Sequence, residues 1–425
     1  MLSYEQLSHK QLEEEYVQQR ACFEAFKSRG LKLNIARGIP CPEQIDLSMD
    51  MLNVCTEKED FLDGATDTRC YGIVDGISSA KKFFAQILGV SADNICIGGN
   101  SSLNLMYDMM IRTKSFGIGG CEPWCKQEGP LKWICIVPGY DRHFGVSEQM
   151  GFEPVPVKML ENGPDMDAIE ELIKDPKVKG MWCIPKHSNP DGTIYSPETV
   201  ERLASLKPAA ADFRIYWDNA YCVHDIYDDC EELANVQELA EKAGNPNLVI
   251  QFMSTSKMTF PGAGVACIAA GPDDIVAIRK HISVQTIGPD KMNQLRHVRY
   301  FKDIDGLKKH MKRHAEFIRP KFEAVLNVFD KEASDLSFVN WSRPRGGYFI
   351  SLNVMPGTAK RTVELAAEGG VALTPAGSTW PLKKDPEDSN IRVAPTNPGV
   401  EEITLAAELL VVSFKLAALE KLLGK

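Results

Sequence analysis

Between about residue 94 and residue 270, short apolar segments alternate with helical patterns, and this alternation restricts the fold more than any other feature of the sequence. Short apolar runs bounded by turn residues are typical of buried strands. Buried strands separated by amphipathic helices predict an α/β fold with a mostly parallel sheet, covered on both faces. Seven strands are expected, at residues 94–97, 133–137, 154–157, 180–184, 214–217, 248–253 and 265–269. Helices are expected between most of them, for example at 102–111, 196–206 and 230–243.

After about residue 300 the pattern changes to a smaller α+β arrangement. A long basic helix is expected at 307–330. It is followed by short strands at 337–340, 347–352 and 390–393 and by helices at 358–368 and 400–423.

Three parts of the chain are therefore expected. An N-terminal segment, residues 1–50, contains an acidic amphipathic helix at 3–29 and joins the small domain. Residues 51–300 form a large, ligand-binding domain, and residues 301–425 form a small C-terminal domain.

Composition excludes several classes of protein. The net charge of −10 argues against a nucleic-acid-binding surface, which requires a basic stripe. No apolar run reaches the 18 residues of a membrane span, and the polar N-terminus lacks a signal core, so a cytoplasmic location is expected. No metal is expected, because Cys121, Cys125 and Cys135 lack a fourth ligand at a useful spacing.

One lysine stands out within residues 251–264. Lys257 follows the apolar run 248–253 and three hydroxyl residues, and a glycine-rich turn and another apolar strand come next. A lysine between two core strands is costly unless it is paired or used covalently, and the hydroxyl groups could bind a phosphate. A surface lysine in a polar loop remains the commoner explanation of such a short motif, so further evidence is needed.

Other polar clusters also follow the predicted strands. Residues 98–102 open a helix with small residues, which suits an anion, although an ordinary helix cap has the same pattern. Tyr140 could cover a flat ring, and Asn189 lies in a turn after a strand. Asp218 ends a strand, with Tyr221 three residues later, and Arg392 lies inside an apolar strand. Buried charges need partners, and ligands of parallel sheets bind at the carboxyl ends of the strands.

The ordered set Asn189-Pro190, Asp218-x-x-Tyr221, Ser254-x-x-Lys257 and Arg392 resembles the pyridoxal-phosphate-dependent aminotransferases of fold type I. The spacings of 29, 39 and 135 residues between Asn189, Asp218, Lys257 and Arg392 agree with that family, and the resemblance covers nearly the whole chain. The residues at 36–38, 99–102 and 285–291 further resemble a divergent bacterial subgroup of aspartate aminotransferases, akin to the effector domain of aminotransferase-like transcriptional regulators.

The resemblance implies pyridoxal 5′-phosphate as the cofactor. Lys257 would form the Schiff base and move the substrate proton, and Asp218 would pair with the pyridine nitrogen. Tyr221 and Asn189 would bond the ring oxygen O3′, and Tyr140 would stack on the ring. The phosphate would be held by the hydroxyl groups of Ser101, Ser102, Ser254 and Ser256.

The resemblance also implies how substrates and a partner subunit bind. Arg392, beside Asn189, would clamp the substrate α-carboxylate. Arg37 and Gly38 lie where relatives cover the substrate, and Arg37 could hold a distal carboxylate. Tyr71 would reach the phosphate of a second subunit, so a homodimer with shared active sites is expected. Alternatives to Arg37 for the distal carboxylate are Arg69, Lys186 and Arg345.

One departure from the family pattern concerns the phosphate. Relatives carry Gly-x-Arg where this chain has Gly262-Ala263-Gly264, so either backbone N–H groups replace the arginine or the phosphate binds less tightly. The expected reaction is transamination between aspartate, or glutamate, and a 2-oxo acid such as 2-oxoglutarate. The alternatives are another pyridoxal-phosphate reaction, of the C–S or β-lyase or decarboxylase type, and a non-catalytic ligand sensor.

Overall fold

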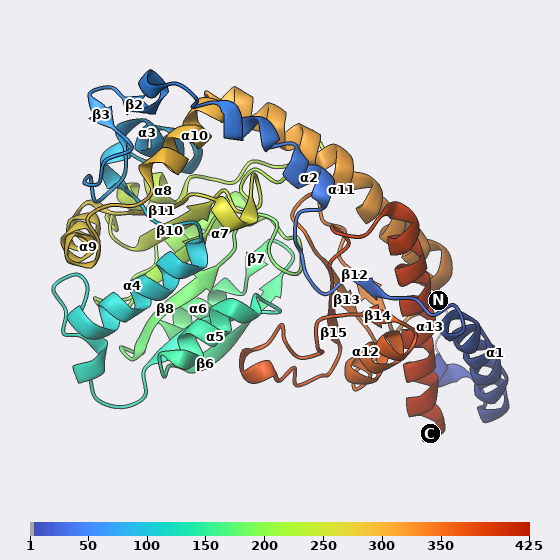
Figure 1. Ribbon diagram of the computed structural model, residues 1–425. Coiled ribbons are helices and arrows are strands. Elements are labelled where there is room, and N and C mark those ends of the chain that lie inside the picture. The colour runs from blue at the N-terminus through green and yellow to red at the C-terminus, as the bar shows by residue number, and fades with distance from the viewer. Residues whose placement is uncertain (1–3) are drawn as a thin grey trace.

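The computed structural model describes residues 4–425, and its largest element is an eight-stranded sheet in the order β4-β11-β10-β9-β8-β5-β6-β7 (Figure 1). The strands are β4 (Ile95–Ile97), β5 (Lys132–Val137), β6 (Glu153–Leu160), β7 (Gly163–Pro164), β8 (Val178–Cys183), β9 (Arg214–Asp218), β10 (Val249–Ser254) and β11 (Ala266–Ala270). Five neighbours from β10 to β6 run parallel, whereas β11 is antiparallel to both of its neighbours. All seven predicted strands are present, and the α/β class is confirmed; the two-residue β7 was not predicted.

Helices cover both faces of this sheet. They are α3 (Ser78–Leu88), α4 (Ser102–Phe116), α5 (Asp141–Gln149), α6 (Met166–Leu172), α7 (Pro197–Ala204), α8 (Val236–Lys242), α9 (Pro272–Gln285) and α10 (Lys291–Phe301). Side chains of β5 alternate between the two faces: Trp133 and Cys135 pack with α4 and α5, whereas Ile134 and Ile136 pack with α6 and α7. This alternation explains why residues 133–137 of the strand are all apolar.

One predicted helix is wrong in part. The helix expected at 230–243 begins only at Val236, because the Asn235 side chain accepts hydrogen bonds from the backbone N–H groups of Gln237 and Glu238 and caps the helix there. The preceding residues form an irregular loop instead.

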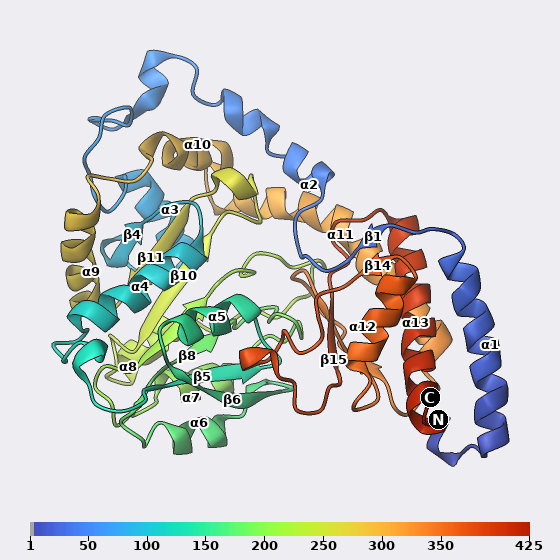
Figure 2. The same ribbon diagram turned by 60° about the horizontal axis from the view of Figure 1, so that its bottom comes forward.

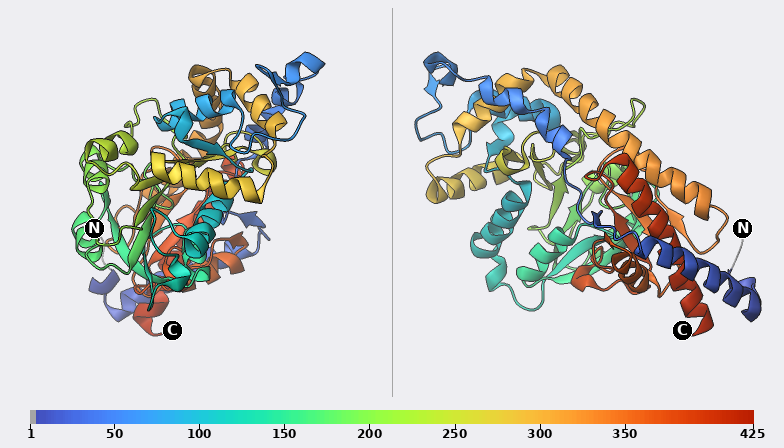
Figure 3. Two further views of the ribbon diagram at one scale, coloured as in Figure 1. Left: turned by 90° about the vertical axis from the view of Figure 1, so that its left-hand side faces the viewer. Right: turned by 45° about the vertical axis from the view of Figure 1, so that its right-hand side comes forward.

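A smaller, three-stranded sheet contains β12 (Asn340–Trp341), β13 (Ile350–Asn353) and β15 (Asn390–Val393). Around it lie α11 (Ile304–Ala333), α12 (Ala359–Glu368) and α13 (Val400–Leu423), and α1 (His9–Lys27) lies along α13 (Figure 3). Strand β1 (Leu33–Asn34) pairs with β14 (Val371–Ala372). The N-terminal segment therefore packs with the C-terminal part of the chain; residue 3 of the predicted first helix lies outside the described residues.

Helix α11 runs through two hydrophobic cores (Figure 1). Leu307 and Met311 pack with α3 and α10, whereas Ile318 and Phe322 pack with α13 and the small sheet. Because one continuous helix joins the cores, the domain boundaries at residues 50 and 300 stay a prediction.

The segment between α2 (Pro42–Asp46) and α3 extends away from both sheets and includes the hairpin of β2 (Leu62–Asp63) and β3 (Thr66–Asp67) (Figure 2). Short 3₁₀ helices complete the chain at Tyr4–Gln6, Met49–Asn53, Lys58–Phe61, Ala92–Asn94, Trp124–Lys126, Pro261–Ala263 and Pro381–Lys383. Within residues 4–425, no helix combines the length and the apolar character needed to cross a membrane.

Candidate active site

The predicted site residues gather where the parallel strands end. Lys257 follows β10, Asp218 is the last residue of β9, and Asn189 and Tyr140 follow β8 and β5. Asp218 pairs with Phe252 of β10, only five residues before Lys257. The Lys257 Nζ atom lies 4.9 Å from the centroid of the Tyr221 ring. The carboxyl ends of the strands are the usual ligand-binding position in such folds.

Lys257 is partly buried, and its backbone is held firmly. Its carbonyl oxygen accepts a hydrogen bond from the Tyr348 hydroxyl at 3.2 Å, and His224 Nε2 lies 3.3 Å from the same oxygen. Burial lowers the pKa of the Lys257 amine, while the charge of Asp218 acts in the opposite direction. A lowered pKa increases the fraction of neutral amine, which is the nucleophilic form.

Asp218 is 3% exposed, and only one of its two carboxylate oxygens has a hydrogen-bond partner. Its Oδ2 atom lies 3.0 Å from His143 Nε2, and His143 stacks on Trp182 with ring centroids 4.5 Å apart. The other oxygen, Oδ1, is buried and has no hydrogen-bond partner. A buried carboxylate oxygen without a donor is costly, so the site fits a ligand that brings a donor to this atom, as a protonated pyridine nitrogen does.

The two predicted tyrosines, Tyr221 and Tyr140, are both protonated at neutral pH because burial raises their pKa values. Tyr221 is 2% exposed, and burial raises its pKa well above the ordinary value, so the phenol stays protonated and can donate a hydrogen bond. Burial also raises the pKa of Tyr140, to about 12. Tyr140 packs edge-on against His143, with ring centroids 5.0 Å apart. His143 was not predicted, although its position three residues after Tyr140, in the first turn of α5, places both rings on one helix face.

Arg392 was predicted to need an anionic partner, and in the structure this partner is Asp141. Arg392 is 7% exposed, and its Nη1 donates to Asp141 Oδ1 at 2.9 Å and to Asn189 Oδ1 at 3.3 Å. Its Nη2 donates to Thr374 Oγ1 at 3.4 Å, whereas Nε is buried without a partner. The guanidinium lies 5.0 Å from the centroid of the Phe349 ring. The structure therefore brings Arg392 and Asn189 together; Asp141 was not predicted.

The backbone of Gly38 lies close to the Phe349 ring. A Cβ atom at Gly38 would lie 2.5 Å from Phe349 Cζ, so only glycine fits this approach. The neighbouring Arg37 side chain is exposed and makes no hydrogen bond or ion pair with any residue of 4–425. The other candidates for a distal carboxylate are already neutralised: Arg69 pairs with Asp67, Lys186 with Asp225 and Arg345 with Asp229.

Four hydroxyl groups lie at the predicted phosphate position. Ser101 and Ser102 begin α4, and within the described chain the side-chain hydroxyls of Ser101, Ser102 and Ser254 make no hydrogen bond to protein. Ser256 Oγ donates to the Asn100 carbonyl oxygen at 2.6 Å. Three free hydroxyls and a helix N-terminus suit an anion.

Gly264 explains how the missing arginine is accommodated. A Cβ atom there would lie 3.1 Å from both the backbone N and the Oγ of Ser256 and 3.2 Å from the Asn100 carbonyl oxygen. Position 264 therefore serves close packing between two loops.

Tyr71 is not brought to the site of its own chain. Its side chain is 86% exposed and has no hydrogen bond or ring contact with the other predicted residues. The adjacent Gly72 packs against Gly288, so the segment that carries Tyr71 lies beside residues 285–291.

Potential metal ligands lie elsewhere. Within residues 4–425, one group has suitable spacing, namely His187, Asp225 and Cys230. Asp225 already bonds the Lys186 ammonium at 2.9 Å, and Cys230 Sγ donates to the carbonyl oxygens of Tyr227 and Arg345. These contacts favour a neutral thiol and a paired carboxylate over a metal centre.

The fold, with a large and mostly parallel sheet beside a smaller domain and with a lysine, an aspartate and a tyrosine at the carboxyl ends of neighbouring strands, is that of a fold type I aminotransferase. The model of the aspartate amino-transferase family matches residues 7–425, and the chain belongs to this family. It is similar to an aspartate aminotransferase of Corynebacterium glutamicum, with 46% identity over 401 residues, which cover 94% of this chain and 92% of the relative. Membership implies pyridoxal phosphate as the cofactor.

Solved structures agree with this assignment. The crystal structure of an aspartate transaminase from Corynebacterium glutamicum matches with a TM-score of 0.96 and 43% identity, over 99% of both chains. The fold is shared with LysN, an α-aminoadipate aminotransferase of Thermus thermophilus solved with N-(5′-phosphopyridoxyl)-L-leucine (TM-score 0.73, 23% identity, 93% of this chain and 95% of that one). The chain is an aminotransferase.

Proposed function

We propose that this aminotransferase binds pyridoxal phosphate at Lys257 and transfers the amino group of aspartate, or glutamate, to a 2-oxo acid such as 2-oxoglutarate. The proposal rests on one observation. Asp218 Oδ1 is buried without a hydrogen-bond partner, and Asp218 ends the strand that pairs with β10, which Lys257 follows. Aspartate is supported by the names of the relatives in Corynebacterium glutamicum.

The reaction class can be tested by product analysis. Kinetics should be measured with aspartate, glutamate, alanine and an aromatic amino acid as donors and 2-oxoglutarate as acceptor. Transamination yields glutamate in equal amount to the oxo acid formed from each of the other donors, whereas a lyase releases ammonia without consuming 2-oxoglutarate. Preference for an aromatic or small neutral donor would contradict the dicarboxylate assignment.

In this proposal each residue has one task. When bound, pyridoxal phosphate supplies an electron sink for the bonds at the substrate α-carbon. With the cofactor bound, the Lys257 amine would hold and move the proton of that carbon, Asp218 would keep the pyridine nitrogen protonated, and Tyr221 would donate a hydrogen bond to O3′. Arg392 orients the α-carboxylate, with Phe349 beneath its guanidinium.

Arg37 is proposed to bind the distal carboxylate, because the other three candidate cations already hold aspartates. Arg37→Ala should raise KM for aspartate and glutamate and lower their kcat/KM by about one to two orders of magnitude, because one charge-assisted hydrogen bond is lost. The kcat/KM for alanine should not change. Arg69→Ala is the matched control and should leave both classes of donor unchanged. Equal losses for alanine and aspartate would make Arg37 structural.

A homodimer is proposed from an exposed apolar surface around Tyr71. Tyr71, Ile73, Phe116, Val284 and Ile287 are each at least 40% exposed, and contacts between Gly72 and Gly288 and between Phe116 and His281 bring their segments together. Contiguous apolar surface of this kind usually marks an interface. The phosphate-binding role of Tyr71 across the dimer is part of this proposal.

Subunit mixing tests the shared site. If Tyr71 serves the partner's site, a Lys257→Ala chain paired with a Tyr71→Ala chain forms one site with both lesions and one with neither. Random exchange should restore about a quarter of the sites. Mixing Lys257→Ala with Asp218→Ala is the control and should restore nothing, since both lesions act within their own chain. A Tyr71 mixture no better than this control, or a fully active monomer, would contradict the proposal.

A further inference from the structure

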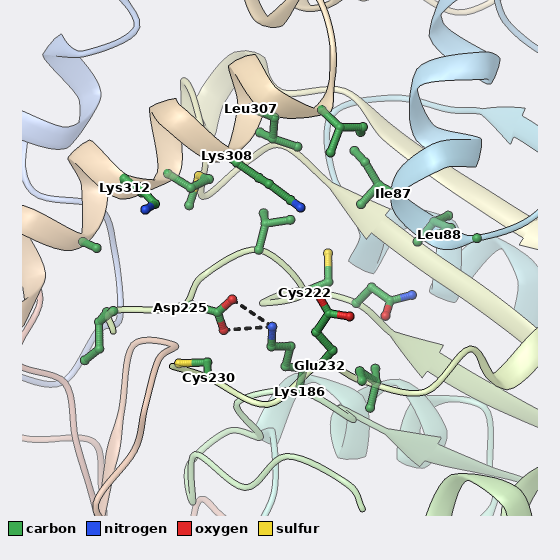
Figure 4. Close-up of a pocket in the computed structure, with 18 of the residues that line it drawn as sticks. Ile87, Leu88, Lys186, Cys222, Asp225, Cys230, Glu232, Leu307, Lys308 and Lys312 are labelled. Atoms are coloured by element: carbon green, nitrogen blue, oxygen red, sulfur yellow. Dashed lines mark hydrogen bonds and ion pairs between the residues drawn. The ribbon is translucent and has the colours of Figure 1, made fainter. Parts of the chain in front are cut away.

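A cavity of about 820 Å³ lies between the loop that follows β9 and helices α3 and α11 (Figure 4). Its walls are the irregular loop at 219–235, the C-terminal end of α3 and the first half of α11. Lys257, Asp218 and Tyr221 are not among its lining residues, whereas Asn219 and Cys222 are. The volume is within the range of small-molecule sites, and the space is separate from the active site.

Most charged side chains of this cavity are already paired. Lys186 bonds Asp225 at 2.9 Å, and Lys312 pairs with Asp228 at 2.9 Å near the rim. Arg319 donates from Nε to the Ile226 carbonyl oxygen at 2.7 Å. These groups are held by their own neighbours and leave little for a ligand.

Three charged side chains of the lining have no ion pair or hydrogen bond in the described chain, namely Glu316 and Lys308 from α11 and Glu232 from the loop. Lys308 and Glu232, of opposite charge, lie on facing walls. Figure 4 shows both side chains extending into the space between these walls. A carboxylate near Lys308 together with an ammonium near Glu232 would satisfy both charges.

The floor of the cavity offers a hydrogen-bond donor to a ligand, and one side of the cavity is apolar. Gln251 is 3% exposed, and its Nε2 is buried without an acceptor, so the floor offers a donor to an anionic or carbonyl oxygen. Ile87, Leu88 and Leu307 form an apolar side (Figure 4). This side suits a hydrocarbon group rather than a second charge.

From these features we infer that the cavity is a binding site for a zwitterionic α-amino acid with an apolar side chain, distinct from the amino donor in the active site. The carboxylate binds Lys308, the ammonium binds Glu232, and the hydrocarbon side chain packs on Ile87 and Leu307. The ligand contacts the loop at 219–235, which follows Asp218 and contains Tyr221.

The test uses L-leucine and the holoenzyme, both as purified and after borohydride reduction, which blocks the active site. Isothermal titration calorimetry should show one saturable site per chain that survives reduction. 4-Methylpentanoate, which lacks the ammonium, and 3-methylbutylamine, which lacks the carboxylate, should each bind at least about tenfold more weakly, since each loses one charge-assisted contact.

Variants assign the site to this cavity. Lys308→Ala and Glu232→Gln should each weaken L-leucine binding at least about tenfold, with unchanged thermal unfolding, because both side chains are exposed. Lys312→Ala is the matched control, since Lys312 already pairs with Asp228, and should bind as the wild type does. Absence of saturable binding, equal affinity for the two analogues, or equal binding by all three variants would overturn the inference.

Discussion

Lys257→Ala should lower the rate of transamination by about 10⁴-fold, at the upper end of what a positioned acid–base group contributes. The variant loses the amine that links to the cofactor and the group that moves the substrate proton. It should also lose the yellow colour of the holoenzyme. Because Lys257 is partly buried and the hydrogen bonds that hold it are made by its backbone carbonyl, folding should be preserved.

Borohydride reduction followed by peptide mass spectrometry checks the attachment independently of turnover. The wild type should carry the reduced cofactor on the peptide that contains Lys257. Lys186→Ala is the matched control: Lys186 also follows a strand, but it is paired with Asp225, and its variant should still be labelled at Lys257. A Lys257→Ala protein that remained reducible and fully active would disprove the assignment.

Asp218→Ala should lower kcat by at least about 10²-fold, the scale of a lost preorganised electrostatic contact. Without the carboxylate, nothing holds the proton on the pyridine nitrogen, and the electron sink is weakened. The same substitution removes the partner of His143 Nε2, so part of the loss could come from a shift of that ring.

Asp218→Asn separates the two effects, because it keeps the volume and can still bond His143 but cannot stabilise a cationic ring. It should be nearly as slow as Asp218→Ala, with a thermal midpoint close to that of the wild type. Asp225→Asn, in the loop that follows Asp218, is the control and should retain most activity, since Asp225 faces Lys186 and His187. Turnover close to wild type in Asp218→Asn would show that Asp218 does not serve the ring.

The sequence predicted the large sheet well because its central strands are buried on both faces, and such strands are mostly apolar. It also predicted that Arg392 needs an anion, since a cation inside an apolar strand has no other stable arrangement. The edge strand β7 was missed, because a two-residue strand leaves no periodic pattern.

Contacts between distant residues explain what could not be predicted. His143 and Asp218 are 75 residues apart, and Asp141 and Arg392 are 251 residues apart, so their pairing depends on how helix α5 packs against two different sheets. No local pattern encodes such a contact. The unpartnered Asp218 Oδ1 is likewise a property of the packed site and not of the strand.

The contact between Arg392 and Asp141 has a consequence for substrate affinity. Under the proposed role of Arg392, a substrate carboxylate does not enter an empty clamp but exchanges with one tethered to the same protein. The measured dissociation constant is then a ratio of two affinities. A tethered group competes at an effective concentration on the order of millimolar. Such an enzyme responds to abundant metabolites across their working concentrations and is not saturated by traces of other carboxylic acids.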